Sequence, residues 1–339
     1  MNSHIYNKVY GKNPPSSLFV FLCLLFTFHF SFYSCPASAQ RVGLVIGGGG
    51  AKGAAAVGAL KAIERSGIRV DYVAGTSIGA VVGALYAAGY TAAELDTLFC
   101  QQQWLQLLTD RNMALSGEPF RQVDGVTYIF GFPVLDKNSS AWGVLHGSRM
   151  EQVIDSLLAA RGAVEFETMR TPFRCVAAEL RTAQEVVLCQ GTVPQAVRAS
   201  MAIPGLFKPV VIDGRSLVDG GMMNNLPVDV VRQMGADIVI AIDLQQARHE
   251  TRPKSDSPLI DLADLIGLGG IADWVLSRPD IRKYNENRKH ADIYINPPLP
   301  DNQASSFGNK HMRRMIDIGE QAAMKQWNAL LSIKKQTAR

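Results

Sequence analysis

The sequence predicts an α/β fold with a mostly parallel central sheet. Short apolar runs alternate with longer segments of helical character, which is the pattern of parallel strands joined by helices. One of these runs, "IVIAID" at Ile238–Asp243, is apolar almost throughout, as expected of a strand buried on both faces. No internal repeat or low-complexity block interrupts the pattern. One large α/β domain accounts for these observations.

Glycines mark the ends of the first two predicted helices. Gly67 and Gly89 each follow a helical stretch, and glycine readily adopts the left-handed conformation that often ends a helix. The expected strands are Val42–Ile46, a strand ending at Ala74–Gly75, Phe173–Glu179, Gln184–Cys189 and Ile238–Asp243. The expected helices are Ala51–Arg65, Ile78–Ala88 and a closing helix at Lys310–Leu331, and the polar stretch Gln245–Ser257 is expected to be a loop.

The segment Gln101–Gly147 follows no sustained period. It mixes aromatic side chains such as Trp104 and Trp142 with glycines and prolines. Long irregular segments of this kind are either caps over a site or surface insertions. The sequence leaves both interpretations open.

The N-terminal stretch, residues 1–39, has the order of a secretory signal peptide. Lys8 and Lys12 precede an apolar run at Leu18–Phe32, and small residues at Ala37–Ala39 follow it. The run has 15 residues, fewer than the ~20 that cross a bilayer, so a permanent membrane anchor is the alternative interpretation. Cleavage after Ala39 predicts export to the periplasm or the cell exterior, with one domain at 40–331 and a tail at 332–339.

Charge and cysteine content argue against several classes of protein. Removing Lys8 and Lys12 with the leader leaves 32 basic and 30 acidic side chains, so no strong basic field points to nucleic acid. Cys100, Cys175 and Cys189 remain, and such a sparse set makes no disulfide framework, although Cys175 and Cys189 could pair if their strands are neighbours. No residues have metal-ligand spacing, so we expect no metal and no cofactor.

Gly48, Gly50 and Gly53 have the G-x-G-x-x-G spacing of a dinucleotide-binding loop. The motif follows a predicted strand and opens a predicted helix, which is the required context. In that fold an acidic residue about 20 positions further on should end the next strand and bind ribose. Asp71 has roughly this spacing, but it begins "DYVAG" and so lies at the wrong end of the strand. A dinucleotide site is therefore the weaker hypothesis.

A second glycine motif, Gly75-Thr76-Ser77-Ile78-Gly79, follows the next predicted strand. It has the G-x-S-x-G pattern of a nucleophile elbow, in which a sharp turn raises a serine hydroxyl above the sheet edge. The helix N-terminus at Ser77 would also favour an anion through its amide donors and its dipole. A tight strand-to-helix turn with a capping Ser or Thr is the structural alternative.

A third motif, Asp219-Gly220-Gly221, makes the combination specific. The glycine loop Gly48–Gly53, the elbow Gly75–Gly79 and Asp219–Gly221 together resemble, in order, the three signatures of the patatin-like phospholipase family, G-G-G-x-[KR]-G, G-x-S-x-G and D-G-[AG]. The similarity extends to "AVRASMAIPGLFKPV" (Ala196–Val210) and "NNLPV" (Asn224–Val228), and it fades in Gln101–Gly147.

This resemblance implies a three-layer α/β/α sandwich and a lipid acyl hydrolase of the phospholipase A or lysophospholipase type. It implies a Ser–Asp dyad in which Ser77 is the nucleophile and Asp219 accepts its proton. Backbone N–H groups of Gly48, Gly49 and Gly50 would form the oxyanion hole. The remaining motif glycines that carry the resemblance are Gly53, Gly75, Gly79, Gly220 and Gly221.

A Ser–Asp–His triad is the rival to the dyad, because an aspartate of ordinary pKa is a weak base for a serine hydroxyl. His290 and His311 follow the acid in the chain and are the candidates, although neither lies in a supporting motif.

Other polar residues near the motifs receive structural roles. Asn224 and Asn225 could order the loop that follows the acid, although capping of the helix that begins near Pro227 is the default expectation. Arg198 and Ser200 are expected to be helix-end residues. Lys52 could add positive potential to the site, but the favoured expectation is a solvated side chain on the first helical turn. An apolar stripe within Leu259–Leu276 could pack on the core or contact a membrane transiently.

Overall fold

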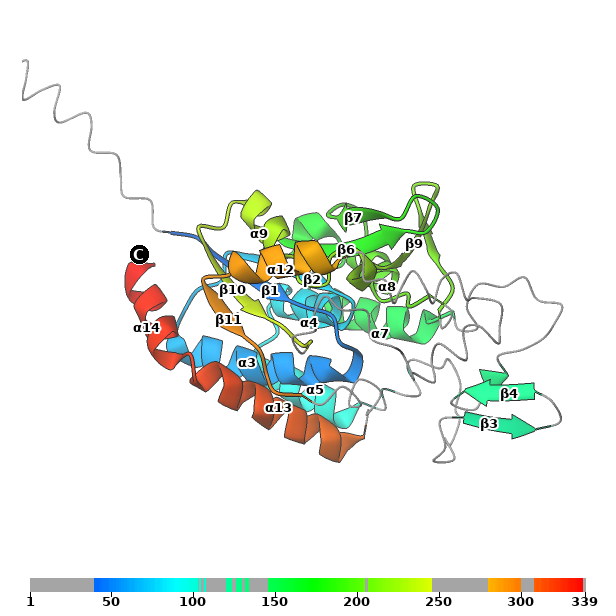
Figure 1. Cartoon of the computed structure of the whole chain (residues 1–339), viewed down its shortest axis with the longest axis horizontal. Coiled ribbons are helices and arrows are strands. Elements are labelled where there is room, and N and C mark those ends of the chain that lie inside the picture. The colour runs from blue at the N-terminus through cyan, green and yellow to red at the C-terminus, as the bar shows by residue number, and fades with distance from the viewer. Residues whose placement is uncertain are drawn as a thin grey trace, which may run out of the picture. The chain divides into compact units, whose positions relative to one another are not determined.

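The computed structural model describes residues 40–102, 104, 107, 120–123, 126–129, 132–133, 146–204, 207–245, 280–299 and 308–337 (Figure 1). The chain divides into two units, Met1–Ala39 and Gln40–Arg339, and all described residues belong to the second. The predicted leader, the apolar stripe at Leu259–Leu276, and most of the predicted loop Gln245–Ser257 and of the segment Gln101–Gly147 therefore lie outside the described residues.

The main sheet is mixed, and its parallel part forms the centre. Its strands are β1 (Val42–Ile46), β2 (Tyr72–Thr76), β6 (Phe173–Glu179), β7 (Gln184–Leu188), β8 (Val210–Ile212), β9 (Arg215–Asp219), β10 (Ile238–Ile242) and β11 (Ile293–Ile295). Neighbours follow the order β11-β10-β1-β2-β6-β9-β8, with β7 paired to β6. The pairs from β11 to β6 are parallel, and those of β7, β8 and β9 are antiparallel. The predicted α/β class is confirmed.

A second, antiparallel sheet lies within the segment of irregular sequence. It contains β3 (Phe120–Val123), β4 (Val126–Ile129) and β5 (Phe132–Pro133), with β4 in the middle.

Helices cover both faces of the main sheet (Figure 1). They are α3 (Gly53–Ser66), α4 (Ile78–Ala87), α5 (Ala92–Gln101), α7 (Ser148–Ala159), α8 (Val193–Ser200), α9 (Val228–Met234), α12 (Ile281–Lys289), α13 (Asn309–Met324) and α14 (Trp327–Gln336). The 3₁₀ helices within the described ranges are η1 (Gly50–Lys52), η2 (Phe166–Thr168) and η3 (Gly220–Met222).

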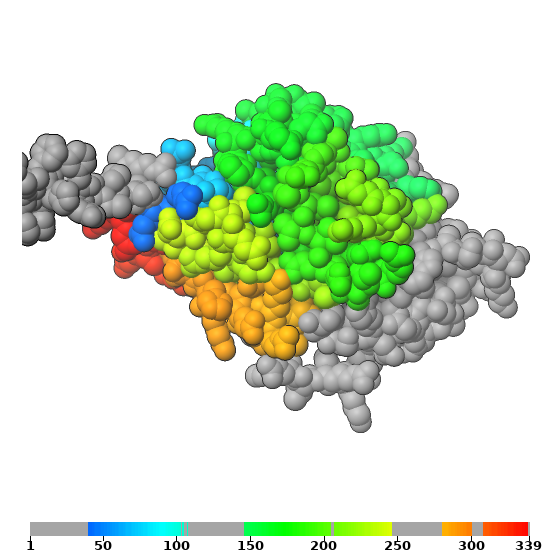
Figure 2. All heavy atoms as spheres, turned by 90° about the horizontal axis from the view of Figure 1, so that it is seen from above, coloured from blue at the N-terminus to red at the C-terminus, as the bar shows by residue number. Residues whose placement is uncertain are grey.

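Alternate residues of β1 point into two different cores, because side chains of a strand alternate between faces. Leu44 and Ile46 belong to the larger apolar cluster, which includes α3, α4 and α13. Val45 belongs to the smaller cluster, which includes α9 and Tyr284 of α12. On this second side the segments of α9 (yellow) and α12 (orange) lie side by side (Figure 2). The sheet is thus the middle of three layers, as the family resemblance implied.

One edge of β6 is shared by two strands that approach from opposite directions. Residues 175–176 of β6 pair with both β2 and β7, so these strands occupy opposite edges. Residues 177–179 pair with both β7 and β9, so β9 also lies opposite β7. Since a strand has only two edges, β2 and β9 must share one. They meet where Thr76 is opposite Val176 and Asp219 is opposite Ala177.

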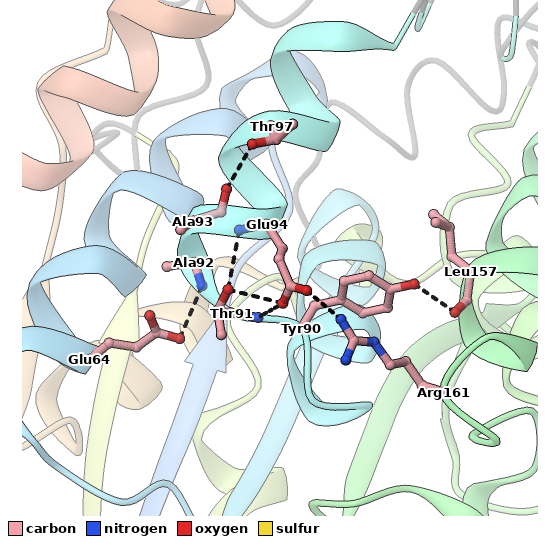
Figure 3. Close-up of polar contacts among 9 residues, drawn as sticks. All are labelled: Glu64, Tyr90, Thr91, Ala92, Ala93, Glu94, Thr97, Leu157 and Arg161. Atoms are coloured by element: carbon pink, nitrogen blue, oxygen red, sulfur yellow. Dashed lines mark hydrogen bonds and ion pairs between the residues drawn. The ribbon is translucent and has the colours of Figure 1, made fainter.

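The bonds around the start of α5 tie α7 to the core (Figure 3). Thr91 caps α5 through a capping box with Glu94, which satisfies amides that a helix start leaves unpaired. Glu94 also accepts a hydrogen bond at 2.5 Å from Arg161, which lies just beyond the end of α7. The Tyr90 hydroxyl donates to the Leu157 carbonyl of α7 at 2.8 Å. These contacts anchor the chain where it returns from the segment of irregular sequence.

The prediction of a single helix at Lys310–Leu331 is wrong. The chain turns at Lys325–Gln326 and forms α13 and α14 separately, and α14 continues to Gln336. The turn directs Leu330 and Ile333 into the larger core, where both are buried. Burial of these side chains favours the break, because an uninterrupted helix would run past the core.

No helix among the described residues is both long enough and apolar enough to span a bilayer.

Helices α3 and α13 pack through glycines at backbone contact. A β-carbon at Gly319 would collide with the Ala55 backbone, 2.6 Å from its carbonyl carbon, and one at Gly58 would lie 2.7 Å from the Glu320 nitrogen. Real β-carbons do not approach backbone so closely, so either helix must move if a side chain is added.

We therefore expect Gly319→Val to lower the free energy of unfolding by about 3 kcal/mol or more, because overpacking at a backbone contact cannot be relieved by rotamers. Asp317→Val is the control: it places the same β-branched residue on the exposed face of α13, where the change should be within about 0.5 kcal/mol. Urea unfolding of both variants measures the difference. Equal destabilisation would show that the helix contact is not the constraint.

Candidate active site

Ser77 lies at a strained turn between β2 and α4. Its backbone has φ 56° and ψ −127°, an unfavourable combination for a residue with a β-carbon. The flanking glycines are required by close backbone approach: a β-carbon at Gly75 would collide with Gly79, and one at Gly79 would lie 2.6 Å from the Gly47 carbonyl oxygen. The predicted strand–turn–helix context of the G-x-S-x-G motif is therefore present in the structure.

The Ser77 hydroxyl donates a hydrogen bond to the Asp219 carboxylate, with 2.6 Å between Oγ and Oδ2. The two residues are only 8% and 7% exposed. Asp219 is the last residue of β9, and its Oδ1 accepts the Gly221 N–H at 2.7 Å. The structure thus brings the two predicted residues into direct contact at the shared edge of β6.

Burial raises the pKa of the Asp219 carboxyl from its ordinary value near 3.8 to about 6, although hydrogen bonds from Ser77 and the Gly221 amide oppose the rise. A carboxylate with this pKa holds a proton more strongly than an exposed aspartate and is still ionised at neutral pH. It is therefore better matched to accept a serine proton near pH 7.

The glycine loop lies directly against the serine. A β-carbon at Gly48 would be 3.1 Å from the Ser77 β-carbon, and one at Gly53 would collide with Ile78. The Gly48 N–H is already used, because it donates to the Asn225 carbonyl at 3.2 Å. The Gly49 and Gly50 N–H groups donate no hydrogen bond to any group in the part of the chain that the structure describes. Of the predicted donors, these two remain available for a ligand.

Asn225 was wrongly predicted to be a helix cap. Helix α9 has no side-chain cap, and the Asn225 side-chain nitrogen donates instead to the Gly48 carbonyl at 3.3 Å. Together with the bond from Gly48 to the Asn225 carbonyl, this makes a reciprocal clamp on the loop. A β-carbon at Gly221 would lie 2.6 Å from Asn225 Oδ1, so the amide fits between the two glycine motifs. Paired amides after Asp-Gly-Gly were the only clue in the sequence.

Asn224 does not cap α9 either. Its side-chain nitrogen donates to Asp229 at 2.8 Å and to Glu185 at 3.0 Å. Its side-chain oxygen accepts from Asn287 of α12 at 3.1 Å, and its carbonyl accepts the Thr76 hydroxyl at 2.8 Å. Asn224 is fully buried, so each polar group needs these partners. The network fixes the loop after Asp219 to the elbow residue Thr76.

Two further residues support the glycine loop. Lys52 was expected to be solvated, but it is only 5% exposed. It lies in η1, which folds back onto the loop, so that a β-carbon added at Gly49 would lie 3.4 Å from the Lys52 β-carbon. Asp243, which follows β10, is fully buried and accepts hydrogen bonds from Tyr284 and, at 2.5 Å, from Tyr294. Burial raises the pKa of the Asp243 carboxyl, and the two phenols oppose this rise. These bonds hold the end of β10 beside the loop.

The rival sites receive no support from the described residues. Asp71 precedes β2 and accepts the Val42 N–H at 2.9 Å, so it lies at the opposite end of the sheet from Ser77, as its position in the sequence indicated. His290 is the C-cap residue of α12, His311 lies in the first turn of α13, and both are exposed. Among the contacts of the described chain, neither histidine bonds to Ser77 or Asp219.

Arg198 and Ser200 lie in α8, Ser200 as its last residue, as expected, but both are buried. The Arg198 side chain donates to the carbonyls of His146 and, at 3.2 Å, Lys208. Cys175 and Cys189 lie on or beside the neighbouring strands β6 and β7, yet both are free thiols.

The fold and the site define the class of this chain: an α/β protein that holds a serine on a strained turn, at the carboxyl edge of parallel strands, against a buried aspartate. A family model described as patatin-like phospholipase matches residues 44–232. The chain belongs to this family.

Relatives of the chain are generally longer proteins. An uncharacterized NTE family protein of Mycobacterium bovis is 34% identical over 221 residues, covering 65% of this chain and 53% of the relative. Patatin-like phospholipase domain-containing protein 7 of Mus musculus is 32% identical over 306 residues, covering 82% of this chain and 21% of that protein. The chain thus spans about half the length of the mycobacterial relative.

Among solved structures, VipD from Legionella pneumophila matches 86% of this chain and 67% of its own, at 15% identity and a TM-score of 0.46.

The raised pKa of Asp219 predicts a pH-dependent effect of Asp219→Asn on stability. Because the folded pKa lies above the unfolded value, the folded state binds the proton more tightly, and its stability falls as pH rises from about 4 to about 6. The variant lacks this charge, so it should be more stable than wild type at pH 8, by at most about 3 kcal/mol, and should lose that advantage at pH 4. Urea unfolding at both pH values measures this, and an identical difference at both would contradict it.

Proposed function

We propose that this protein hydrolyses acyl esters of lipids through a Ser77–Asp219 dyad. The observation that carries the proposal is the 2.6 Å hydrogen bond from the Ser77 hydroxyl to the buried Asp219 carboxylate. It supplies a nucleophile and a base in contact, which is the geometry that activated nucleophiles require. The pKa of Asp219, raised to about 6, lets this carboxylate act without a histidine.

In the first step, Ser77 Oγ attacks the ester carbonyl carbon while its proton passes to Asp219 Oδ2. The carbonyl π electrons move to oxygen and form a tetrahedral oxyanion. When the intermediate collapses, the bond to the alcohol breaks, and the alcohol leaves with the proton from Asp219. An acyl group remains on Ser77 as an ester.

In the second step, water attacks this ester and gives its proton to Asp219. Collapse of the second tetrahedral intermediate breaks the bond to Oγ, which recovers the proton, and releases the fatty acid. The dyad ends in its starting protonation state.

The Gly49 and Gly50 amides are the donors that we propose for the oxyanion. They have no acceptor in the described chain, and the loop lies against Ser77. The Gly48 amide instead fixes the loop through Asn225. Because loss of one such donor costs ~10²–10³ in turnover, the clamp that orients the loop should matter for rate.

Lipid esters are the substrate class that family membership supports, and phospholipase A or lysophospholipase activity is the specific form that we propose. Such substrates lie in membranes, so the protein would contact a membrane surface transiently. Release of fatty acid from a panel of phospholipids, lysophospholipids and acylglycerols tests the substrate class. Labelling of Ser77 by a fluorophosphonate probe tests the activated serine independently of substrate.

We also propose that the protein is exported after cleavage at Ala39. The compact unit begins at Gln40, the residue that follows the predicted cleavage point. N-terminal sequencing of the protein from its native cells should begin at Gln40, and an intact Met1 would contradict export by this route.

The dyad predicts which substitutions abolish activity. Ser77→Ala and Asp219→Asn should each lower kcat by at least about 10³-fold, because each removes a group that takes part in bond making or proton transfer. His290→Ala and His311→Ala should stay within about twofold of wild type, since both side chains are exposed and, among the described contacts, neither bonds to Ser77 or Asp219. Hydrolysis of a p-nitrophenyl ester measures kcat. A folded histidine variant as inactive as Ser77→Ala would overturn the dyad in favour of a triad.

The pKa of Asp219 also predicts the pH profile. Only the ionised carboxylate can accept the serine proton, so kcat/KM should fall as pH decreases through about 6 and should be level above it. Initial rates from pH 4.5 to 8 at low substrate, with folding checked by circular dichroism at each pH, give the midpoint. A midpoint near that of an ordinary aspartate, about 4, would show that burial does not tune this base.

A further inference from the structure

Ser200 makes two hydrogen bonds beside the elbow. Its hydroxyl accepts the backbone N–H of Ser77 at 2.9 Å and donates to the backbone carbonyl of Val176 at 2.6 Å. The side chain is fully buried at the end of α8. Ser200 therefore contacts the backbone of the proposed nucleophile and not its hydroxyl.

These two hydrogen bonds take the place of one direct backbone hydrogen bond in the parallel pairing of β2 with β6. The Val73 N–H donates to the Pro172 carbonyl at 3.0 Å, and in a parallel pair such bonds repeat at every second residue. The register Val73↔Phe173 would then direct the Ser77 N–H to the Val176 carbonyl. The Ser200 hydroxyl stands between this donor and this acceptor. It keeps both groups bonded while Ser77 leaves the strand.

The same segment also contacts the aspartate. The Asp219 N–H donates to the Ala202 carbonyl at 2.9 Å, two residues after Ser200. Ser200 and Ala202 thus hold the backbones of Ser77 and Asp219 from one short stretch of chain. The two strands meet end to end at β6 and have no direct pairing with each other. Pairing with β6 places the two strands, and this stretch adds hydrogen bonds to the residues at their ends.

We propose that Ser200 is a positioning residue that sets the Ser77 hydroxyl at hydrogen-bonding distance from Asp219. The inference rests on the proposed hydrolytic function, and it assigns Ser200 no contact with substrate. Its hydroxyl proton is used by the Val176 carbonyl, so Ser200 is not a second nucleophile. Without the hydroxyl, the Ser77 amide and the Val176 carbonyl lose their partner, and the strained turn loses its support.

The test compares Ser200→Ala with Ser66→Ala in the full chain. Ser66 is the matched control, because its buried hydroxyl also donates to a backbone carbonyl at 2.6 Å, that of Ile63, but lies in α3 away from the elbow. Ser200→Ala should lower kcat by about 10–10²-fold with little change in KM, since misplacement of a reacting group by about 1 Å has effects of this size. Ser66→Ala should keep wild-type kcat. Ser200→Thr retains the hydroxyl and should recover most of the activity.

Hydrogen exchange at the Ser77 amide provides a readout that needs no catalysis. The exchange rate should rise at least about tenfold in Ser200→Ala and stay unchanged in Ser66→Ala, because only the first variant removes the acceptor of this amide. If Ser200→Thr does not fold, these two alanine variants decide the matter by exchange and kcat together.

The outcomes separate the two proposals. A wild-type protein that neither hydrolyses esters nor is labelled at Ser77 would refute the proposed function, and the role of Ser200 in catalysis would fall with it. A labelled wild type with Ser200→Ala within about twofold in kcat would refute the positioning role alone. Loss of kcat in both alanine variants in proportion to a lowered melting temperature would also refute it, because both hydroxyls would then act only through stability.

Discussion

The site depends on the one edge of β6 that β7 does not occupy. Because β7 occupies the other edge, β2 and β9 must both pair along this one, and they meet between Val176 and Ala177. The residues at the two strand ends are Thr76, followed by Ser77, and Asp219. Sheet register therefore brings the backbones of the serine and the aspartate to neighbouring positions on β6. The hydrogen bond between them forms across the point where one ladder stops and the other begins.

Forming the pair is unfavourable in two respects, and surrounding structure compensates for both. Ser77 adopts a positive φ, and the Asp219 carboxylate is taken out of water. Gly75 and Gly79 allow neighbouring backbone to close around the turn, while the Gly221 amide bonds to the buried carboxylate. The same burial that destabilises the ion raises its pKa into the range of a useful base. The desolvation cost of the carboxylate and its raised pKa thus have one origin, the burial of Asp219.

Polar bonds between distant segments place the loops, whereas apolar packing places the layers. The two cores orient α3, α4 and α9 against the sheet without direction-specific contacts. The glycine loop is instead held by the reciprocal bonds of Asn225, and the loop after Asp219 by the amides of Asn224 and its partners. Directional bonds of this kind are needed because an amide in the loop must face one particular point. A cluster of buried amides and half-buried carboxylates beside the site follows from this requirement.

The sequence by itself determined the strands β1, β2 and β10, the turn at Ser77 and the identity of the three motifs, because periodicity and glycine requirements act within a few residues. Tertiary structure alone decided which groups meet: Ser77 and Asp219 are 142 positions apart, Ser77 and Ser200 are 123 apart, and Asn225 and Gly48 are 177 apart. The burial of Lys52, the break between α13 and α14 and the raised pKa of Asp219 likewise depend on neighbours from other segments. Local patterns carry no information about these neighbours, since partners and desolvation arise only when the sheet edges and layers come together.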